Sequence, residues 1–335
     1  MAKKILGMEI GNSRLRIAVC SDYNLEQMVT ADVPENAVRE DEIVSWEAMA
    51  DFIKETLKEH KISVKNAAVV LPESMCYIKR VTLPAMDVDQ LKVNLPYEFH
   101  DYITEEKEKY AYDYAVIKQI AGPDGKITEI DLEAVAVLKE TVKKYRTMLK
   151  RAGLRLTSLA PEFCALKNII GDYEEVKGLN EGMSKDYAIL DIGYRSNKIS
   201  FFTKGEYEIT RTMEPGSEAI DMQIADILDK DVHIASIYKE NNTDEILRDP
   251  ACMEIYNQMA IEIMRVLNFY NFNHPENSLD TIHYCGGGAM ITPLIEAVKE
   301  TVEINVLPIS ELFTDEYEDV DAIVAGPRAL GIVWE

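Results

Sequence analysis

The sequence is poor in basic residues, and this shortage excludes several classes of partner. Its 335 residues include 36 Lys and Arg against 59 Asp and Glu, which gives a formal net charge of −23. Nucleic acids and anionic lipid surfaces are bound mainly through clustered Lys and Arg. We therefore expect no nucleic-acid binding, and contact with a membrane only through a partner protein.

Paired cysteines and long apolar runs are also absent. The sequence has no Cys-x-x-Cys motif, and its five cysteines are scattered at Cys20, Cys76, Cys164, Cys252 and Cys285. An odd number of scattered thiols is typical of a reducing compartment. No apolar run approaches the ~20 residues of a membrane-spanning helix, and the amino terminus lacks the apolar core of a signal peptide. These absences predict a cytoplasmic protein.

The two common nucleotide-binding fingerprints, GxGxxG and GxxxxGK[ST], are missing as well. The chain contains instead one pattern that occurs twice. Residues 5–19 read ILGMEIGNSRLRIAV, and residues 189–202 read ILDIGYRSNKISFF. Each copy is an apolar strand, an acidic residue, Ile-Gly, a short polar turn and a second apolar strand. At 335 residues, the chain should hold about two domains or one unit of two lobes.

The paired segments indicate a phosphate clamp. The turn of a hairpin that carries glycine and polar side chains can point backbone N–H groups at phosphate oxygens. The acids of the two copies, Glu9 and Asp191, could hold a hydrated Mg²⁺ between two facing hairpins. Either copy alone is also compatible with an ordinary hairpin that has a polar tip.

A third candidate is the run Gly286, Gly287 and Gly288, which stands between a predicted strand and a predicted helix. Glycines let the backbone approach a flat ligand because no Cβ lies in the way. The start of the following helix presents free N–H groups. A plain tight turn is the alternative interpretation of this run.

Hydrophobic periodicity and turn residues predict the elements around these motifs. Strands are expected over residues 5–8, 15–20, 67–71, 77–83, 110–120, 127–138 and 281–284. Helices are expected over residues 46–60, 88–102, 140–151, 217–228, 252–272 and 293–302, with Pro96 kinking or dividing the second. The polar segment 172–186 is expected to cross between the lobes.

The order of hairpin, insert, second hairpin, long helix and glycine turn resembles the actin-like ATPase superfamily. Four segments resemble its PilM branch, which is related to FtsA: Leu83–Met86, Leu138–Leu159, Ala260–Tyr270 and Asp321–Gly331. The resemblance covers nearly the whole chain. It implies an α/β fold of two actin-like lobes, built from duplicated ribonuclease-H-like domains, with a small inserted α+β subdomain.

The resemblance also implies domain limits and a ligand. The first lobe would comprise residues 1–84, 152–180 and 323–335, the insert residues 85–151, and the second lobe residues 181–322. The ligand would be ATP with Mg²⁺. The residues that match the phosphate, adenosine and metal positions are Gly11, Asn12, Ser13, Gly193, Tyr194, Arg195, Gly286, Gly287, Gly288 and Met290, with Glu9 and Asp191 facing the metal. No catalytic residue is assigned, and the chain would be at most a weak ATPase.

Several residues depart from the pattern of that family. Glu9 stands where the family has Asp, and the bulky Tyr194 and Arg195 stand where it prefers a small residue after Gly193. Lys198 replaces an acid. These changes narrow the phosphate pocket, although Arg195 could itself contact a phosphate. A scaffold that has lost nucleotide binding therefore stays open as an alternative.

As a PilM-like protein, the chain would be a cytoplasmic scaffold of type IV pilus assembly or of a related secretion system. Its partner would be a PilN-like inner-membrane protein, bound through that protein's cytoplasmic N-terminal segment, which recruits the scaffold to the membrane. Homo-oligomerisation stays open. One rival is an FtsA-like division protein, which carries a C-terminal membrane helix that we do not expect after Trp334. The other is an actin-fold phosphotransferase, for which we find no further candidate Asp.

The insert contains a cluster of aromatic residues and a basic helix. The aromatic residues are Tyr97, Phe99, Tyr102, Tyr110, Tyr112 and Tyr114, and the basic residues of the helix are Lys139, Lys143, Lys144, Arg146, Lys150 and Arg151. Alternation at positions 110, 112 and 114 places three tyrosines on one face of a strand. Core packing is one interpretation, and a groove for an extended partner peptide is the other.

Overall fold

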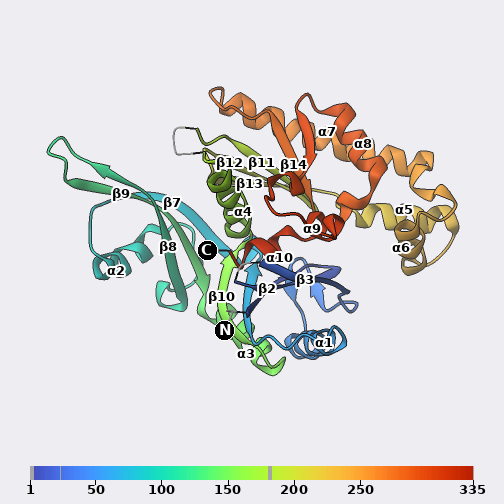
Figure 1. Ribbon diagram of the computed structural model, residues 1–335, viewed down its shortest axis with the longest axis horizontal. Coiled ribbons are helices and arrows are strands. Elements are labelled where there is room, and N and C mark those ends of the chain that lie inside the picture. Colours follow the sequence, from blue (N-terminus) through green and yellow to red (C-terminus); the bar gives the residue numbers. More distant parts are fainter. Residues whose placement is uncertain (1–3, 23, 180–182, 335) are drawn as a thin grey trace.

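Two five-stranded sheets form the framework of the molecule (Figure 1). The structure, a computed structural model, describes residues 4–22, 24–179 and 183–334. The strand order of the first sheet is β10-β6-β1-β2-β3. Its strands are β1 (Lys4–Ile10), β2 (Arg14–Ser21), β3 (Asn24–Asp32), β6 (Asn66–Leu71) and β10 (Arg155–Pro161).

The second sheet has the equivalent order, β13-β12-β11-β14-β15. Its strands are β11 (Tyr187–Ile192), β12 (Asn197–Thr203), β13 (Glu206–Met213), β14 (Thr281–Cys285) and β15 (Asn305–Pro308). In each sheet an antiparallel meander of three strands is extended by two parallel strands. The two duplicated lobes that the resemblance implies are confirmed.

Helices cover the outer face of each sheet and fill the space between the sheets (Figure 1). The first sheet is covered outside by α1 (Trp46–Glu59) and α3 (Lys139–Arg151). The second is covered by α5 (Glu218–Leu228), α6 (Val232–Asn241), α7 (Pro250–Asn273) and α8 (Thr292–Thr301). Between the sheets lie α4 (Glu162–Lys177), α9 (Val320–Ala325) and α10 (Pro327–Gly331). Short strands β4 (Val38–Arg39) and β5 (Glu42–Ile43) form a separate pair.

The inner faces of the two sheets share one hydrophobic core. Ala18 and Cys20 of the first sheet and Ile189 and Phe202 of the second belong to the same buried cluster. Because side chains alternate between the faces of a strand, residues 5, 7 and 9 of β1 and residues 187, 189 and 191 of β11 all face inward. The alternation therefore directs Glu9 and Asp191 toward the space between the lobes.

The inserted subdomain is a three-stranded sheet with one helix packed on it. The order is β7-β9-β8, with β7 (Cys76–Pro84), β8 (Tyr110–Ala121), β9 (Ile127–Leu138) and the helix α2 (Val88–Glu98). Asp87 and Gln90 form a capping box at the start of α2. The helix ends at Glu98 and not at residue 102 as predicted, because the chain turns there to bury Phe99 in the core of the insert.

Packing also moves two predicted limits. Tyr145, Met148 and Leu149 of α3 lie in the outer core of the first lobe, so this helix belongs to that lobe and not to the insert. Strand β7, which begins at Cys76, supplies an edge of the insert sheet, and Cys76 itself packs against the core of the first lobe. The predicted crossing at 172–186 begins later, since α4 continues to Lys177. The predicted lobe limit at residues 180 and 181 lies outside the described residues.

The other five predicted helices are confirmed with ends within two residues. Ser45 accepts a hydrogen bond from the Ala48 N–H at the start of α1, and Asp249 caps α7 in the same way, with Pro250 at its first position. None of the helices within the described ranges is both long and apolar enough to cross a bilayer.

Two glycines offer a matched test of this packing. A Cβ on Gly7 would overlap the backbone carbonyl of Ala329 in α10, whereas a Cβ on the exposed Gly171 in α4 would meet nothing within 4 Å. We expect Gly7→Ala to lower the free energy of unfolding by about 3 kcal/mol through overpacking. We expect Gly171→Ala to raise it by about 0.5–1 kcal/mol, because alanine favours the helix. Urea denaturation measures both; equal effects would contradict the close seating of α10 on β1.

Candidate functional site

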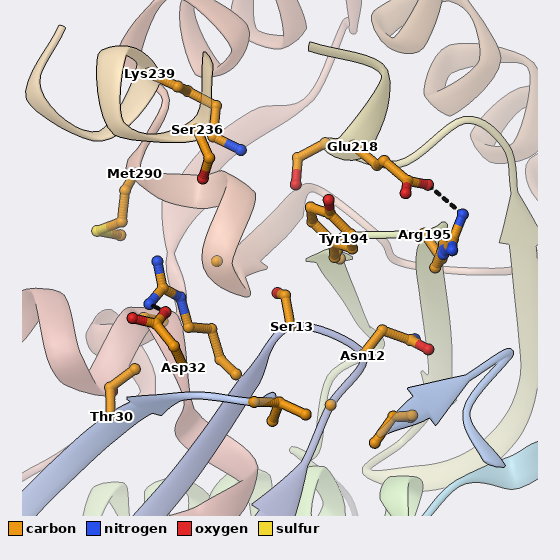
Figure 2. A pocket seen from close by; sticks show the side chains of 18 of the residues that line it. Asn12, Ser13, Thr30, Asp32, Tyr194, Arg195, Glu218, Ser236, Lys239 and Met290 are labelled. Carbon is orange, nitrogen blue, oxygen red and sulfur yellow. Dashed lines mark hydrogen bonds and ion pairs between the residues drawn. The ribbon is translucent and has the colours of Figure 1, made fainter. Parts of the chain in front are cut away.

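A cleft of about 1470 Å³ lies between the two lobes. Both hairpin turns and the glycine turn contribute to its wall (Figure 2). Ten of the twelve residues predicted from sequence line it: Glu9, Gly11, Asn12, Ser13, Asp191, Gly193, Tyr194, Arg195, Gly287 and Met290. Gly286 and Gly288 do not line it. The fold therefore brings segments about 180–280 residues apart in sequence into one cavity, although their ligand stays a prediction.

The first hairpin turn is held by its own polar groups. The Gly11 N–H donates to the Arg14 carbonyl at 2.9 Å. The amide side chain of Asn12 donates to the Asp41 carboxylate at 2.7 Å and accepts from the Asp41 backbone N–H at 3.1 Å. Asn12 thus fixes the turn against the loop between β4 and β5, while Ser13 faces the pocket (Figure 2).

The second hairpin turn is fastened to the start of α5. The N–H groups of residues 216, 217 and 218 donate to the carbonyls of residues 195, 193 and 194, each at 2.9 Å. A Cβ on Gly193 would overlap the Ser196 carbonyl, and a Cβ on Gly216 would overlap the backbone of this turn. Gly216 was not singled out from the sequence, because only the tertiary contact reveals why glycine is needed there.

The two bulky residues of that turn already have partners. Arg195 forms an ion pair with Glu218, which Figure 2 shows as a dashed line. The Lys239 ammonium lies 5.9 Å from the centre of the Tyr194 ring. Burial, with the charges of Asp221 and Glu218, raises the pKa of Tyr194 to about 12. Tyr194 is therefore a neutral wall of the cleft, and a phosphate would have to compete with Glu218 for Arg195.

Packing explains two of the three glycines in the turn after β14. Gly286 has a φ of +92°, and its N–H donates to the Val324 carbonyl at 2.9 Å. Side chains on Gly286 or Gly288 would overlap Asp191 and Ile192 of β11. Only Gly287 opens to the cleft, where its nearest neighbour would be the flexible end of Arg16 at 3.1 Å. The 3₁₀ helix η4 (Gly287–Met290) leads from this turn to Met290 at the rim.

A buried arginine lies between the two predicted metal ligands. Arg328 of α10 donates to Glu9 Oε1 at 2.6 Å and to Asp191 Oδ2 at 2.7 Å. Arg16 Nη1 lies 3.5 Å from the same Glu9 oxygen. Burial acts to lower the pKa of Arg328, but Asp191 and Glu9 raise it well above its usual range. The guanidinium is therefore a permanent positive charge at the centre of the cleft.

This arrangement does not fit the metal role that the resemblance implies for Glu9 and Asp191. Mg²⁺ requires carboxylate and water oxygens in near-octahedral geometry. Here one oxygen of each carboxylate accepts a hydrogen bond from Arg328. Throughout the ranges that the structure describes, no group of three or more His, Cys, Asp or Glu side chains could hold a metal ion.

Lys198 links the lobes from the second hairpin. Its ammonium donates to both oxygens of Glu162, at 2.9 and 3.1 Å, and lies 3.6 Å from Asp41. Glu162 is the first residue of α4 and Asp41 belongs to the first lobe. Burial alone would lower the pKa of Lys198, but these two carboxylates raise it. The lysine that replaces an acid of the family pattern therefore forms ion pairs with two partly buried carboxylates.

Two lobes of equivalent topology, with hairpin turns and a glycine turn around the cleft between them, define the actin-like class of proteins. The family model described as "Type IV pilus assembly protein PilM" matches residues 7–318. The chain therefore belongs to the PilM family of type IV pilus assembly proteins.

Solved structures agree on the fold. The chain is similar, at 20% identity and a TM-score of 0.79, to a protein in the structure titled "PilM-PilN type IV pilus biogenesis complex", covering 98% of this chain and 97% of that one. The ethanolamine utilization protein EutJ from Carboxydothermus hydrogenoformans matches at 14% identity with a TM-score of 0.59, covering 99% and 90%. MreB 5 of Spiroplasma citri bound to AMPPNP matches at 13% identity with a TM-score of 0.50, covering 92% of each chain.

The pKa of Glu73, which lies near Glu162 and Lys198, makes stability depend on pH. Burial and the charge of Glu162 raise this pKa from 4.5 to about 7, although Lys198, Thr210 and Arg328 act to lower it. The folded state therefore binds a proton that the unfolded chain releases near pH 4.5. The contribution of this group to the free energy of unfolding is largest below that pH. It decreases as the pH rises toward about 7 and does not change further above that pH.

We expect Glu73→Gln to remove this dependence. Glutamine keeps the size of the side chain and an acceptor for Thr210, whose hydroxyl donates to Glu73 Oε1 at 3.2 Å. The variant should gain stability relative to the parent as the pH rises from about 5 to about 7, with a constant difference above that. Denaturant unfolding at several pH values measures the difference; a gap that does not change with pH would contradict the raised pKa.

Proposed function

We propose that this protein is an actin-like scaffold of type IV pilus assembly, or of a related secretion system. It works at the cytoplasmic face of the membrane and binds the cytoplasmic N-terminal segment of a PilN-like membrane protein. The observation that carries the proposal is the family match over residues 7–318. The insert and both lobes are also covered by the similarity to the protein in the PilM–PilN structure.

The insert offers an apolar surface suited to such a partner. Phe99 and Tyr110 are buried in its core, which supports the packing interpretation for these two aromatic residues. Tyr97 and Tyr102 are instead 57% and 50% exposed, and Val93, one turn before Tyr97 on α2, is 64% exposed. Exposed aromatic residues supply much of the energy of protein interfaces. We therefore place the partner surface at the end of α2.

The basic helix α3 is separate from this surface. Arg151 pairs with Asp51 at 2.7 Å, and Lys144 with Glu140 at 3.0 Å. Since α3 packs in the first lobe, deleting residues 85–151 would remove part of that lobe's core along with the insert. Point substitutions are the sharper test.

We expect the double variant Tyr97→Ala/Tyr102→Ala to bind a synthetic peptide of the PilN-like N-terminal segment about ten-fold more weakly than the parent, a loss of about 1.4 kcal/mol. Fluorescence polarisation of the labelled peptide measures the affinity. The matched control is Phe272→Ala, which removes an aromatic side chain that is 82% exposed on α7. A parent that does not bind the peptide would refute the proposed partner; equal binding by the double variant would refute the surface alone.

We propose in addition that the cleft accepts the phosphate tail of a nucleotide. Support comes from the convergence of both hairpin turns and Gly287 on one cavity. The loss of nucleotide binding remains the alternative, favoured by the pairing of Arg195 with Glu218 and of Lys198 with Glu162. Whether or not the cleft binds a nucleotide, we assign no residue to its hydrolysis.

Gly287→Val tests the nucleotide site with little effect on the fold. Its added side chain would project into the cleft, whereas substitutions at Gly286 or Gly288 would disturb the packing on β11. We expect ADP affinity, measured by calorimetry, to fall by about ten-fold or more. Unchanged peptide binding serves as the control for folding. If the parent itself binds no ADP, the protein is a scaffold without nucleotide.

A further inference from the structure

Arg328 is the one residue that touches the acids of both repeated hairpins among the described ion pairs. Glu9 lies on β1 of the first lobe, and Asp191 lies at the equivalent position on β11 of the second. The two carboxylates and the guanidinium are each about nine-tenths or more buried as side chains. The bridge therefore joins the lobes at the point where the resemblance would place a metal ion.

Three positive side chains offset the two hairpin acids and Glu162 without a metal. Glu9 faces Arg16 across its hairpin, and Asp191 faces Lys198 across the other. Arg328 then supplies a third positive charge for the set Glu9, Asp191 and Glu162, the last of which binds Lys198 at 2.9 Å. A divalent cation at the two hairpin acids would meet the guanidinium at contact distance in a weakly screened interior, where repulsion is strong.

The backbone around Arg328 is also fixed in place. Two glycines allow the helix to pack closely on β1 and β2: a Cβ on Gly7 of β1 would overlap Ala329, and a Cβ on Gly326, just before α10, would overlap Arg16 of β2. The side-chain amide of Asn168 in α4 donates to the Gly331 carbonyl at 2.9 Å. With α10 held on both sides, the guanidinium is pre-positioned between the two acids.

We propose that Arg328 takes the place of a divalent cation in this cleft, joining Glu9 of the first lobe to Asp191 of the second and excluding Mg²⁺. The two lobes are thereby held together without a metal. Any phosphate ligand of the cleft then binds without Mg²⁺; this part rests on the proposed nucleotide site, whereas the metal exclusion does not. The planar guanidinium suits this role, because its two terminal nitrogens each donate a separate hydrogen bond to one carboxylate.

The parent protein provides the first test. Mn²⁺, used as a paramagnetic probe for Mg²⁺, should show no stoichiometric site by electron paramagnetic resonance at physiological ionic strength. The melting temperature should be the same in MgCl₂ and in EDTA. A stoichiometric Mn²⁺ site in the parent that is lost in Asp191→Asn would overturn the proposal. This test needs no variant at Arg328, so it decides the matter even if such variants do not fold.

Arg328→Ala provides the second test, since it removes the cation that the two facing carboxylates share and leaves only Arg16 beside Glu9. We expect this variant to melt lower than the parent in EDTA and to regain about 2 °C or more in MgCl₂, because an ion that binds only the folded state stabilises it. It should also acquire a Mn²⁺ site. The matched control is Arg248→Ala, which breaks an exposed pair with Glu296 and should show no response to Mg²⁺. A folded Arg328→Ala protein without any metal response would overturn the proposal.

ADP separates this inference from the nucleotide proposal. Equal ADP affinity of the parent in EDTA and in MgCl₂ supports both. Binding that requires Mg²⁺ supports the nucleotide site and overturns the role of Arg328. If ADP binds under neither condition, the nucleotide proposal fails, and the Mn²⁺ measurement decides the metal exclusion on its own.

Discussion

The contact between Arg328 and the two hairpin acids is the interaction on which the centre of the molecule depends. It places one guanidinium against a carboxylate from each lobe, at 2.6 and 2.7 Å. Removing one member of a buried ion pair costs about 3–5 kcal/mol, because the partner charge is left uncompensated. The strand alternation that directs Glu9 and Asp191 inward therefore requires a compensating charge, and α10 provides it.

The same requirement explains the other unusual residues of the cleft. Lys198 would be a poor choice beside a bound metal, but it suits a site in which Glu162 and Asp41 must be neutralised across the lobes. Gly7 and Gly326 let α10 approach β1 and β2 closely enough for Arg328 to reach both acids. The cleft is thus held by ion pairs of the chain itself, and the surface that we propose for the partner lies on the insert.

Much of the fold followed from local patterns. The resemblance implied the duplicated lobes, and periodicity and turn residues placed five of the six predicted helices to within two residues. Errors arose where tertiary packing overrode the local signal: α2 ends early because Phe99 enters the insert core, and α3 joins the first lobe through Tyr145, Met148 and Leu149. A helix that is amphipathic in sequence does not reveal which sheet its apolar face will cover.

The sequence alone indicated the two hairpins, five further strands and their polar turns, because these depend on neighbours within a few positions, and it named ten of the residues that line the cleft. Only the tertiary structure decided what those residues do. Glu9 and Asp191 resemble metal ligands until Arg328, 137 residues after the second of them, is seen between them. Gly286 and Gly288 likewise resemble ligand contacts until their overlap with β11 is measured. Charge compensation and close packing act between residues distant in sequence, so no local pattern records them.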